Sequence, residues 1–286
     1  MSGEIITVIP WMCASMNCVD LDRYPLNELD GKHGRTLIAR VRTQMLAQGA
    51  CELPGFMSAQ GLELAIAQSN DLATRAHPSR SRATAYLSVA DAAFPASHPR
   101  AQLSSSSVRV VGYDQIPTQH VLRQLYEWQP LHDFVAAVLD LPRVYRYDDP
   151  MGALNIAVMG DGDELGWHFD QTDFVLSIPL VPAQTGGEFE VHPLIRTTED
   201  ERYEAVALAL VDAGPAPLKL AMTPGSLLVF QGRHSLHRVT PIAGPRDRLV
   251  ALLAYDRKPG TDSTAELKRA RYGRTVPLSR YTPADH

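Results

Sequence analysis

The second half of the chain consists of short apolar runs separated by turns. From about residue 143 onward, Gly, Pro and Asp punctuate a series of β-like segments. About eight runs can be distinguished: 153–159, 165–170, 173–181, 187–195, 217–222, 226–230, 237–242 and 248–255. Many short strands with turns between them are typical of two packed sheets. We therefore predict an α+β protein with a double-stranded β-helix (jelly-roll) core over residues 143–260.

Residues 1–142 have a different pattern and are predicted to be mainly helical. Apolar residues at helical spacing recur in three segments: 35–48, which ends before Gly49, then 59–74, and 118–140, broken at Pro130. We expect this portion to pack on the barrel and to cover its mouth. The helical portion, the jelly-roll core and a tail over residues 261–286 would form one integrated domain.

Composition predicts loops and one further helix between these elements. The basic cluster HPSRSR (77–82) and the serine-rich stretch 95–110 are interpreted as loops, the first as a solvated one rather than an anion site. A helix is expected after Thr198 as N-cap, with acidic residues in its first turn and Gly214 after its end.

Charge and hydropathy restrict the classes of partner. The net charge of −5 argues against a general nucleic-acid or membrane-surface role. No apolar run approaches the roughly 20 residues of a membrane span. The first residues, MSGEIITVIPWM, lack the basic region and long apolar core of a signal peptide. We therefore expect a cytoplasmic protein that acts on a small molecule. The sequence pattern leaves its oligomeric state open, and a homodimer is one possibility.

The three cysteines do not predict a disulfide framework. Cys13, Cys18 and Cys51 form an odd, sparse set, and no second pair completes a zinc site. Buried or idle thiols are the favoured interpretation.

His168 and Asp170 stand two apart in GWHFDQTDF (166–174). Residues i and i+2 of a strand share one face, so both side chains could hold one metal ion. The spacing alone is weak evidence, because a half-buried strand can carry the same pair by accident. The aromatic residue before the pair, Trp167, and His192 further on are interpreted as packing and strand residues.

A third ligand must come from a distant segment. His234 and His237 are the candidates, the first in a loop and the second in a strand. Arg248 opens the last apolar strand, where a guanidinium on the inward face is costly unless it meets an anion. Arg246 lies close enough in sequence to compete for that role.

In this order, HFD at 168–170, His237 and Arg248 resemble the iron(II)- and 2-oxoglutarate-dependent dioxygenases. The motif of that family is H-x-D, a long gap, His, and then Arg or Lys about ten residues on. The segments GGEFE (186–190) and PGSLLVF (224–230) are also similar to the family. The resemblance covers roughly residues 150–257.

The resemblance implies a set of ligands and cofactors. His168, Asp170 and His237 would bind Fe(II), and 2-oxoglutarate and O2 would take the remaining positions. Arg248 would pair with the distal carboxylate of 2-oxoglutarate, and Asn155 would lie near the co-substrate. Other branches place a tyrosine near position 157, where this chain has Ala157, so that contact is in doubt.

More narrowly, the run around GDGDELGWHFD, together with GRHSLHRVTP, is similar to the branch of free-amino-acid halogenases and related hydroxylases. Halogenases of that branch have glycine where this chain has Asp170, which implies hydroxylation rather than halogenation. The expected substrate is a free amino acid or a derivative. Desaturation or cyclisation by the same machinery, or a barrel that binds metal without redox chemistry, are the alternatives.

Overall fold

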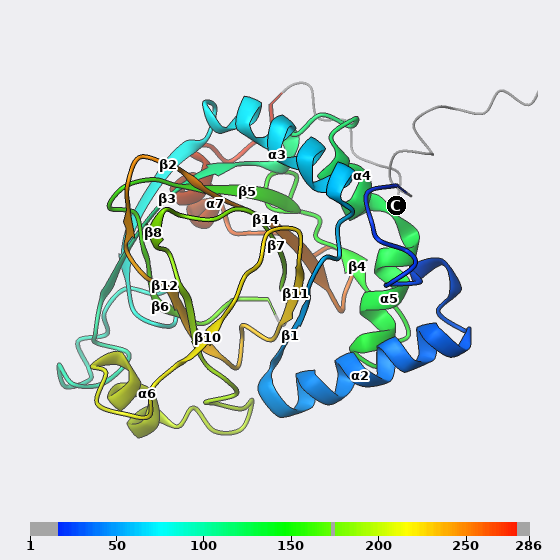
Figure 1. Ribbon diagram of the computed structural model, residues 1–286. Helices are drawn as coiled ribbons and strands as arrows, with labels where there is room; N and C mark the ends of the chain where they lie inside the picture. Colours follow the sequence, from blue (N-terminus) through cyan, green and yellow to red (C-terminus); the bar gives the residue numbers. More distant parts are fainter. Residues whose placement is uncertain (1–16, 173–174, 279–286) are drawn as a thin grey trace, which may run out of the picture.

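Twelve strands form one antiparallel sheet that curls into a barrel, as the computed structural model of residues 17–172 and 175–278 shows (Figure 1). The strands are β1 (Ala50–Leu53), β2 (His77–Ala83), β3 (Ser104–Val111), β4 (Tyr145–Arg146), β5 (Leu154–Met159), β6 (Leu165–His168), β7 (Val175–Val181), β9 (Phe189–His192), β10 (Leu218–Leu220), β11 (Leu227–Phe230), β12 (Leu236–Val239) and β14 (Arg248–Asp256). The main path runs β1-β11-β7-β14-β5-β3-β6-β12-β9-β10, with β2 paired to β3 and β4 to β14. A separate pair, β8 (Thr185–Gly186) and β13 (Ile242–Ala243), completes the strands. The predicted jelly-roll core is confirmed.

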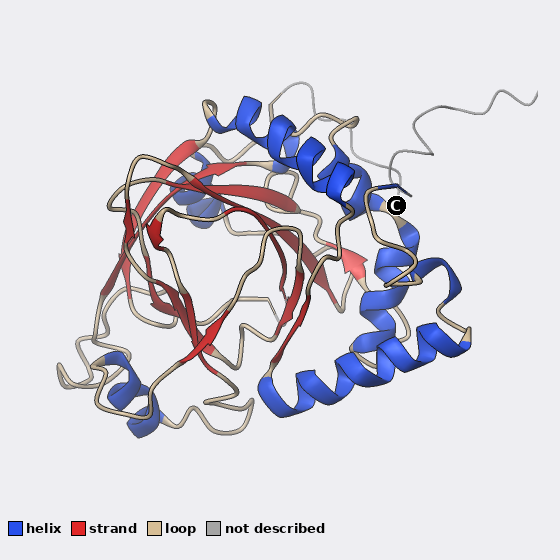
Figure 2. Cartoon of the chain, viewed as in Figure 1, coloured by secondary structure: helices blue, strands red, loops and turns tan. Residues whose placement is uncertain are grey.

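The helices pack around the outside of this barrel (Figure 2). They are α2 (Lys32–Gln48), α3 (Ala59–Ala73), α4 (Val121–Glu127), α5 (Gln129–Val138), α6 (Tyr203–Leu210) and α7 (Ala265–Tyr272), with 3-10 turns η1 (Leu26–Glu28) and η2 (Tyr113–Gln115). Leu154, Ile156 and Val158 of β5 belong to the main hydrophobic core that the outer helices cover. Since side chains alternate along a strand, Asn155 and Ala157 face the barrel interior. The helices α2 to α5 therefore cover the outer face of the sheet.

Two segments predicted as loops are paired strands. Residues 77–82 lie in β2, which pairs along its whole length with β3, and β3 occupies the second half of the predicted loop 95–110. Their Ser and Arg side chains conceal the strand in the sequence, because most of β2 and β3 is exposed or half-buried and needs no apolar face. β2 is an edge strand, where Pro78 costs no ladder hydrogen bond.

Two helix boundaries also differ from the prediction. The break in 118–140 falls at Trp128, and Pro130 instead lies in the first turn of α5, where its missing N–H is not needed. The later helix begins at Tyr203 with Arg202 as N-cap, so Thr198 is not its cap. The hydroxyl of Thr197 instead accepts the backbone N–H groups of residues 199 and 200, which closes a separate turn before the helix.

The two earlier helices and the free thiols of the first half are confirmed where the structure describes them. Helices α2 and α3 match the two periodic segments, and Gly49 ends α2 in the left-handed conformation. Cys18 and Cys51 are free, buried thiols, and burial raises their pKa values to about 12 and about 11. Cys13 lies outside the described residues.

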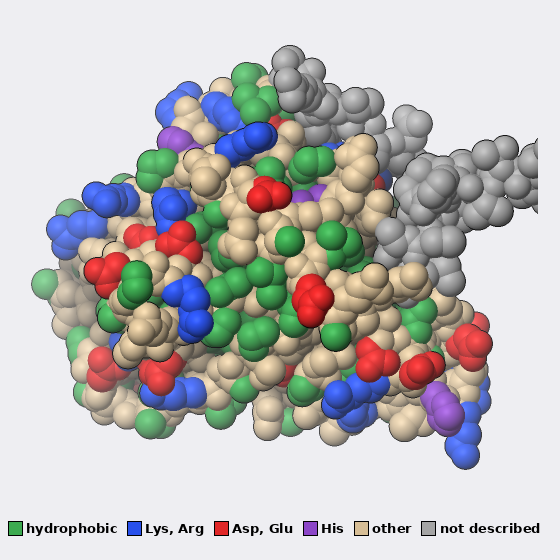
Figure 3. All heavy atoms as spheres, turned by 45° about the horizontal axis from the view of Figure 1, so that its top comes forward, with side chains coloured by type: hydrophobic (Ala, Val, Ile, Leu, Met, Phe, Trp, Pro, Cys, Tyr) green, Lys and Arg blue, Asp and Glu red, His purple; other side chains and the backbone are tan. Residues whose placement is uncertain are grey.

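The charged surface is mixed in sign. On the face that Figure 3 shows, basic and acidic side chains are interspersed. Within the described ranges no helix is both long and apolar enough to cross a membrane.

Candidate metal centre

Strand register brings two histidines to one point inside the barrel. His168 at the end of β6 and His237 on β12 are direct partners in the antiparallel pair, and their ring centroids are 4.1 Å apart. Asp170 follows in the loop after β6. Its Oδ1 lies 4.0 Å from His168 Nε2 and 3.6 Å from His237 Nε2. In the described part of the chain these three form the one cluster with metal-ligand geometry.

Both imidazoles are oriented by backbone carbonyls two residues upstream. His168 Nδ1 lies 2.8 Å from the carbonyl oxygen of Gly166, and His237 Nδ1 lies 2.9 Å from that of Ser235. A neutral ring that donates through Nδ1 keeps a free lone pair on Nε2. The hydrogen bonds thus hold both Nε2 atoms toward Asp170, as a metal site requires.

The shifted pKa values of His168 and Asp170 favour the protonation states that bind a cation. Burial, together with the neighbouring His237, lowers the pKa of His168 to about 4, so this ring is neutral at pH 7. Burial alone would raise the pKa of Asp170, but the attraction of His237 and His168 outweighs it and lowers the pKa. Two atoms bound at about 2.1 Å to one ion cannot lie more than about 4.2 Å apart. The distances of 3.6 and 4.0 Å from Asp170 Oδ1 satisfy that limit.

Gly232, in the loop between β11 and β12, makes room for the carboxylate of Asp170. A Cβ atom on Gly232 would overlap Asp170 Oδ2 and lie 2.5 Å from its Cγ. The carbonyl oxygen of Gly232 also accepts the backbone N–H of Asp170 at 3.1 Å. Only glycine at 232 is therefore compatible with this position of the Asp170 side chain.

The opposite face of the H-x-D segment is packed firmly. Phe169 points away from the metal ligands into a cluster with Trp167, and its backbone N–H donates to the carbonyl of Ala85. The guanidinium of Arg196 lies 3.9 Å from the centroid of the Phe169 ring. The ring of His192 packs at a tilt against Trp167, with 5.1 Å between the ring centroids, which agrees with the packing roles predicted for these two residues.

Arg248 is buried in the barrel. It is 6% exposed, and burial lowers its pKa to about 10. Its hydrogen-bond contact is Met159 Sδ at 3.7 Å, and Gly187 packs so close that an added Cβ would lie 3.2 Å from its Cδ. Among residues 17–172 and 175–278 no carboxylate pairs with it. Arg246, the competing candidate, is exposed and contacts the carbonyl of Ala183.

Asn155 lies inside the barrel, but both ends of its amide already have partners. Its Nδ2 donates to the carbonyl of Met151 at 2.8 Å, and the hydroxyl of Tyr272 donates to its Oδ1 at 2.9 Å. The contact of Asn155 with 2-oxoglutarate stays a prediction. His234, the alternative third ligand, lies in the loop before β12 and is not part of the three-residue cluster.

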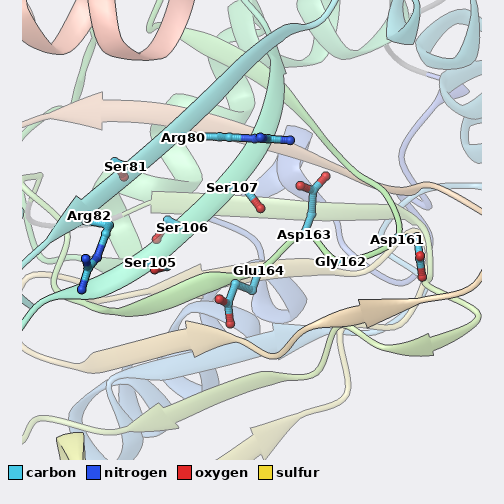
Figure 4. Close-up of a pocket in the computed structure, with 10 residues that line it drawn as sticks. All are labelled: Arg80, Ser81, Arg82, Ser105, Ser106, Ser107, Asp161, Gly162, Asp163 and Glu164. Carbon is cyan, nitrogen blue, oxygen red and sulfur yellow. The ribbon is translucent and has the colours of Figure 1, made fainter.

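A separate hollow lies between β2, β3 and the turn 161–164, and none of the triad residues lines it (Figure 4). Arg80 and Arg82 share it with the carboxylates of Asp161, Asp163 and Glu164. Because charges of both signs meet there, the hollow does not favour an anion.

Sequence reasoning missed two residues near the triad. Gly232 carries no signal of its own, since its role depends on the position of Asp170. Arg271 lies beyond the segment that carries the family motifs, yet its charge lowers the pKa of both His168 and Asp170.

Comparison with known families and structures gives a consistent result. The model of the halogenase D family (HalD) matches residues 83–272, about two thirds of the chain. No curated protein sequence matches significantly. The solved structures below are all less than 25% identical to this chain, so they establish the fold alone.

Three solved structures illustrate that fold. An oxidoreductase of the 2OG-Fe(II) oxygenase family from Burkholderia pseudomallei is 19% identical, with a TM-score of 0.51, over 78% of this chain and 92% of that one. AviO1 from Streptomyces viridochromogenes Tue57 is 17% identical, with a TM-score of 0.52, over 79% and 97%. The epimerase SnoN, solved with Fe3+, alpha ketoglutarate and nogalamycin RO, is 13% identical, with a TM-score of 0.53, over 88% and 97%. The family match confirms the resemblance to the halogenase branch noted from the sequence motifs, and the solved structures agree with it in fold.

Proposed function

This chain belongs to the halogenase D family, and we propose that it is an iron(II)- and 2-oxoglutarate-dependent oxygenase. The proposed reaction is hydroxylation of an unactivated C–H bond in a small polar metabolite, a free amino acid or a derivative. The overall change would be R–H + 2-oxoglutarate + O2 → R–OH + succinate + CO2.

One observation carries this proposal: three residues with metal-ligand geometry share the barrel interior with a buried guanidinium that has no carboxylate partner among the described residues. His168, Asp170 and His237 supply two imidazoles and one carboxylate, the set that suits non-haem Fe(II) and leaves coordination positions open. A structural zinc site takes four protein ligands, and a metal held only for structure has no use for Arg248. The donor set and the cation together therefore favour an oxygenase over a non-redox metal-binding barrel.

Each residue has a defined task in this reaction. The two Nε2 atoms and the Asp170 carboxylate would hold iron, while the carbonyls of Gly166 and Ser235 fix the ring orientations. Iron, with 2-oxoglutarate and O2, supplies the oxidant that cleaves the C–H bond. Arg248 would donate two hydrogen bonds to the distal carboxylate of 2-oxoglutarate, and this pairing would offset the cost of burying its charge. The apolar wall around Arg248, which includes Met159 and Ile242, would exclude water.

Asp170 supports hydroxylation in spite of the family name. Its carboxylate occupies the position where the halogenases that this chain resembles have glycine. The close fit of Gly232 against that carboxylate supports a ligand role for aspartate at this position. A site with all three protein ligands has one position fewer for a halide.

Succinate release tests the proposal directly. Purified protein, loaded with Fe(II) in the absence of oxygen, would be mixed with 2-oxoglutarate, ascorbate, air and a panel of free amino acids and small metabolites. We expect succinate release coupled to a product 16 Da heavier than its substrate, as one added oxygen atom requires. Asp170→Ala should lose this turnover, whereas wild-type succinate release by that variant would exclude the triad.

The same assay separates the alternative reactions by product mass. Parallel reactions with sodium chloride or bromide should still give the hydroxylated product. A halogenated product would make the protein a halogenase, and a product lighter than the substrate by two hydrogens would indicate desaturation or cyclisation.

A further inference from the structure

We propose that Arg271, on helix α7, binds a carboxylate of the substrate beside the metal triad, so that the enzyme selects small carboxylic acids. This inference rests on the proposed function, because it assigns the substrate contact of that same site. It gives a role to the segment after residue 260, which the sequence pattern suggests is only a tail.

Helix α7 is fixed to the barrel at both ends. At its start Thr264 caps the helix, and Lys268 Nζ lies 2.6 Å from Asp262 Oδ1 and 3.9 Å from the fully buried Asp149. After its end Arg274 contacts both carboxylate oxygens of the buried side chain of Asp114, at 2.7 Å each. A side chain on α7 therefore has a well-defined position relative to the sheet.

Tyr272 attaches α7 to the strand that faces the site. Its ring packs with Val110 and Met151, and its hydroxyl donates to Asn155 on the inward face of β5. Gly273 ends the helix in the left-handed conformation, and a Cβ there would lie 2.9 Å from the ring nitrogens of His77 on β2. These contacts hold the last turn of α7 against the barrel interior.

Arg271 lies on the flank of the buried face of this helix. Lys268 and Tyr272 are buried four residues apart, and Arg271, three residues after Lys268, is half-buried next to them. Its Nε atom is buried and has no hydrogen-bond partner in the described part of the chain. The adjacent Tyr272 reaches Asn155 on the inward face of β5, so Arg271 lies on the turn of α7 that packs against the barrel interior. The charge of Arg271 also lowers the pKa of both His168 and Asp170, which agrees with that position.

The neighbouring cations of α7 and its flanks differ from Arg271 in this respect. Lys268 and Arg274 have carboxylate partners, and Arg269 is exposed to water. For Arg271 no ion pair is found within residues 17–172 and 175–278. A half-buried guanidinium whose buried Nε lacks a hydrogen-bond partner is stabilised by a carboxylate, which its planar fork can bind through two hydrogen bonds.

The site therefore contains two separate cations for two anionic ligands. Arg248 lies on β14 against Met159 and Gly187, and it suits the co-substrate. Arg271 comes from α7, and a carboxylate bound to it would hold the rest of the substrate beside the triad. Fixing one end of a small molecule in this way determines which of its carbons faces the metal.

Binding measurements on metal-loaded protein test this assignment without turnover. Manganese(II), a divalent ion that binds a given N/O site less tightly than Fe(II), would replace iron in the presence of 2-oxoglutarate, and exclusion of O2 would prevent turnover. The probes are the proteinogenic L-amino acids and simple hydroxy acids, each beside its primary amide. We expect one or more acids to bind by calorimetry and their amides to bind at least 10-fold more weakly.

Variants then connect this preference to one residue. Arg271→Gln should weaken binding of the acid by roughly 10- to 150-fold and leave binding of the amide nearly unchanged. Arg271→Lys should retain part of the preference, because it keeps the charge without the planar fork. Arg269→Gln, on the exposed side of the same helix, is the matched control and should behave as wild type. Equal thermal unfolding midpoints would show that all three variants are folded.

Three outcomes would overturn the assignment to the substrate. Equal affinity for acids and amides, or binding of no acid at all, would show that Arg271 does not select a carboxylate. A rise in the KM for 2-oxoglutarate in Arg271→Gln during uncoupled turnover, as large as that of Arg248→Ala, would assign Arg271 to the co-substrate instead. Absence of any 2-oxoglutarate turnover by iron-loaded wild type would instead refute the proposed function.

Discussion

Gly232→Ala is expected to damage the metal centre without adding a polar or charged group. The new Cβ would lie 2.5 Å from Asp170 Cγ, whereas ordinary contacts begin at 3.4 Å, so the carboxylate carbon must move by about 0.9 Å. Metal–ligand distances in a functional site hold to about 0.2 Å. The displaced carboxylate can no longer bind together with both imidazoles. We expect metal affinity to fall by roughly 10- to 100-fold, the usual effect of losing a group that orients a ligand.

Anaerobic titration with Fe(II) or Mn(II) measures this effect, and succinate release reports its consequence. Gly214→Ala is the matched control, because its Cβ would meet its nearest neighbour at an ordinary 3.5 Å and its backbone needs no positive φ. Both variants should be folded, with similar unfolding midpoints.

A double-mutant cycle isolates the steric mechanism. In an Asp170→Gly background the carboxylate is absent, so Gly232→Ala should cost no further metal affinity. If Gly232→Ala weakens metal binding equally in both backgrounds, or binds metal as tightly as wild type, the argument that Gly232 accommodates Asp170 is wrong.

Three further predictions concern other parts of the molecule. Arg248→Ala should raise the KM for 2-oxoglutarate by 10-fold or more, while replacement of the exposed Arg246 by Ala should change this KM little. If steady-state kinetics gave the reverse order, the co-substrate role would move to Arg246. His237→Ala should lose metal affinity far more severely than His234→Ala in the same titration, since only His237 belongs to the cluster, and equal losses would contradict the triad. The metal-free protein should lose stability as pH falls from about 6.5 to about 4, because burial lowers the pKa of His120 to about 4 and only the unfolded state binds that proton in this window. The loss from His120 should approach 3 kcal/mol, and His120→Asn, which keeps an acceptor for the start of α4, should flatten the chemical-denaturation profile over these pH values.

The local sequence pattern was sufficient to predict helices and strands wherever the spacing of apolar side chains reflects a buried face. Strands such as β5 and β14 and the helices α2 and α3 bury one face or both, so their apolar spacing identifies them. Strands β2 and β3 bury little and are held by backbone hydrogen bonds to each other, which serine and arginine side chains do not reveal. The predicted start of α6 was also wrong, because Thr197 closes a local turn at the place where the acidic residues suggested the first turn of a helix.

In the candidate site, too, local sequence spacing predicted some of the residues, and tertiary packing decided the others. His168 and Asp170 are two residues apart, so chain geometry alone brings them near each other, and the order of His237 and Arg248 after them pointed to the family. The choice between Arg248 and Arg246 depends on which guanidinium the sheet buries. The fit of Gly232 against Asp170, and the approach of Arg271 from α7, join segments far apart in the chain. Such contacts arise only when the barrel closes, because the packing of distant backbones, and no local period, brings those atoms together.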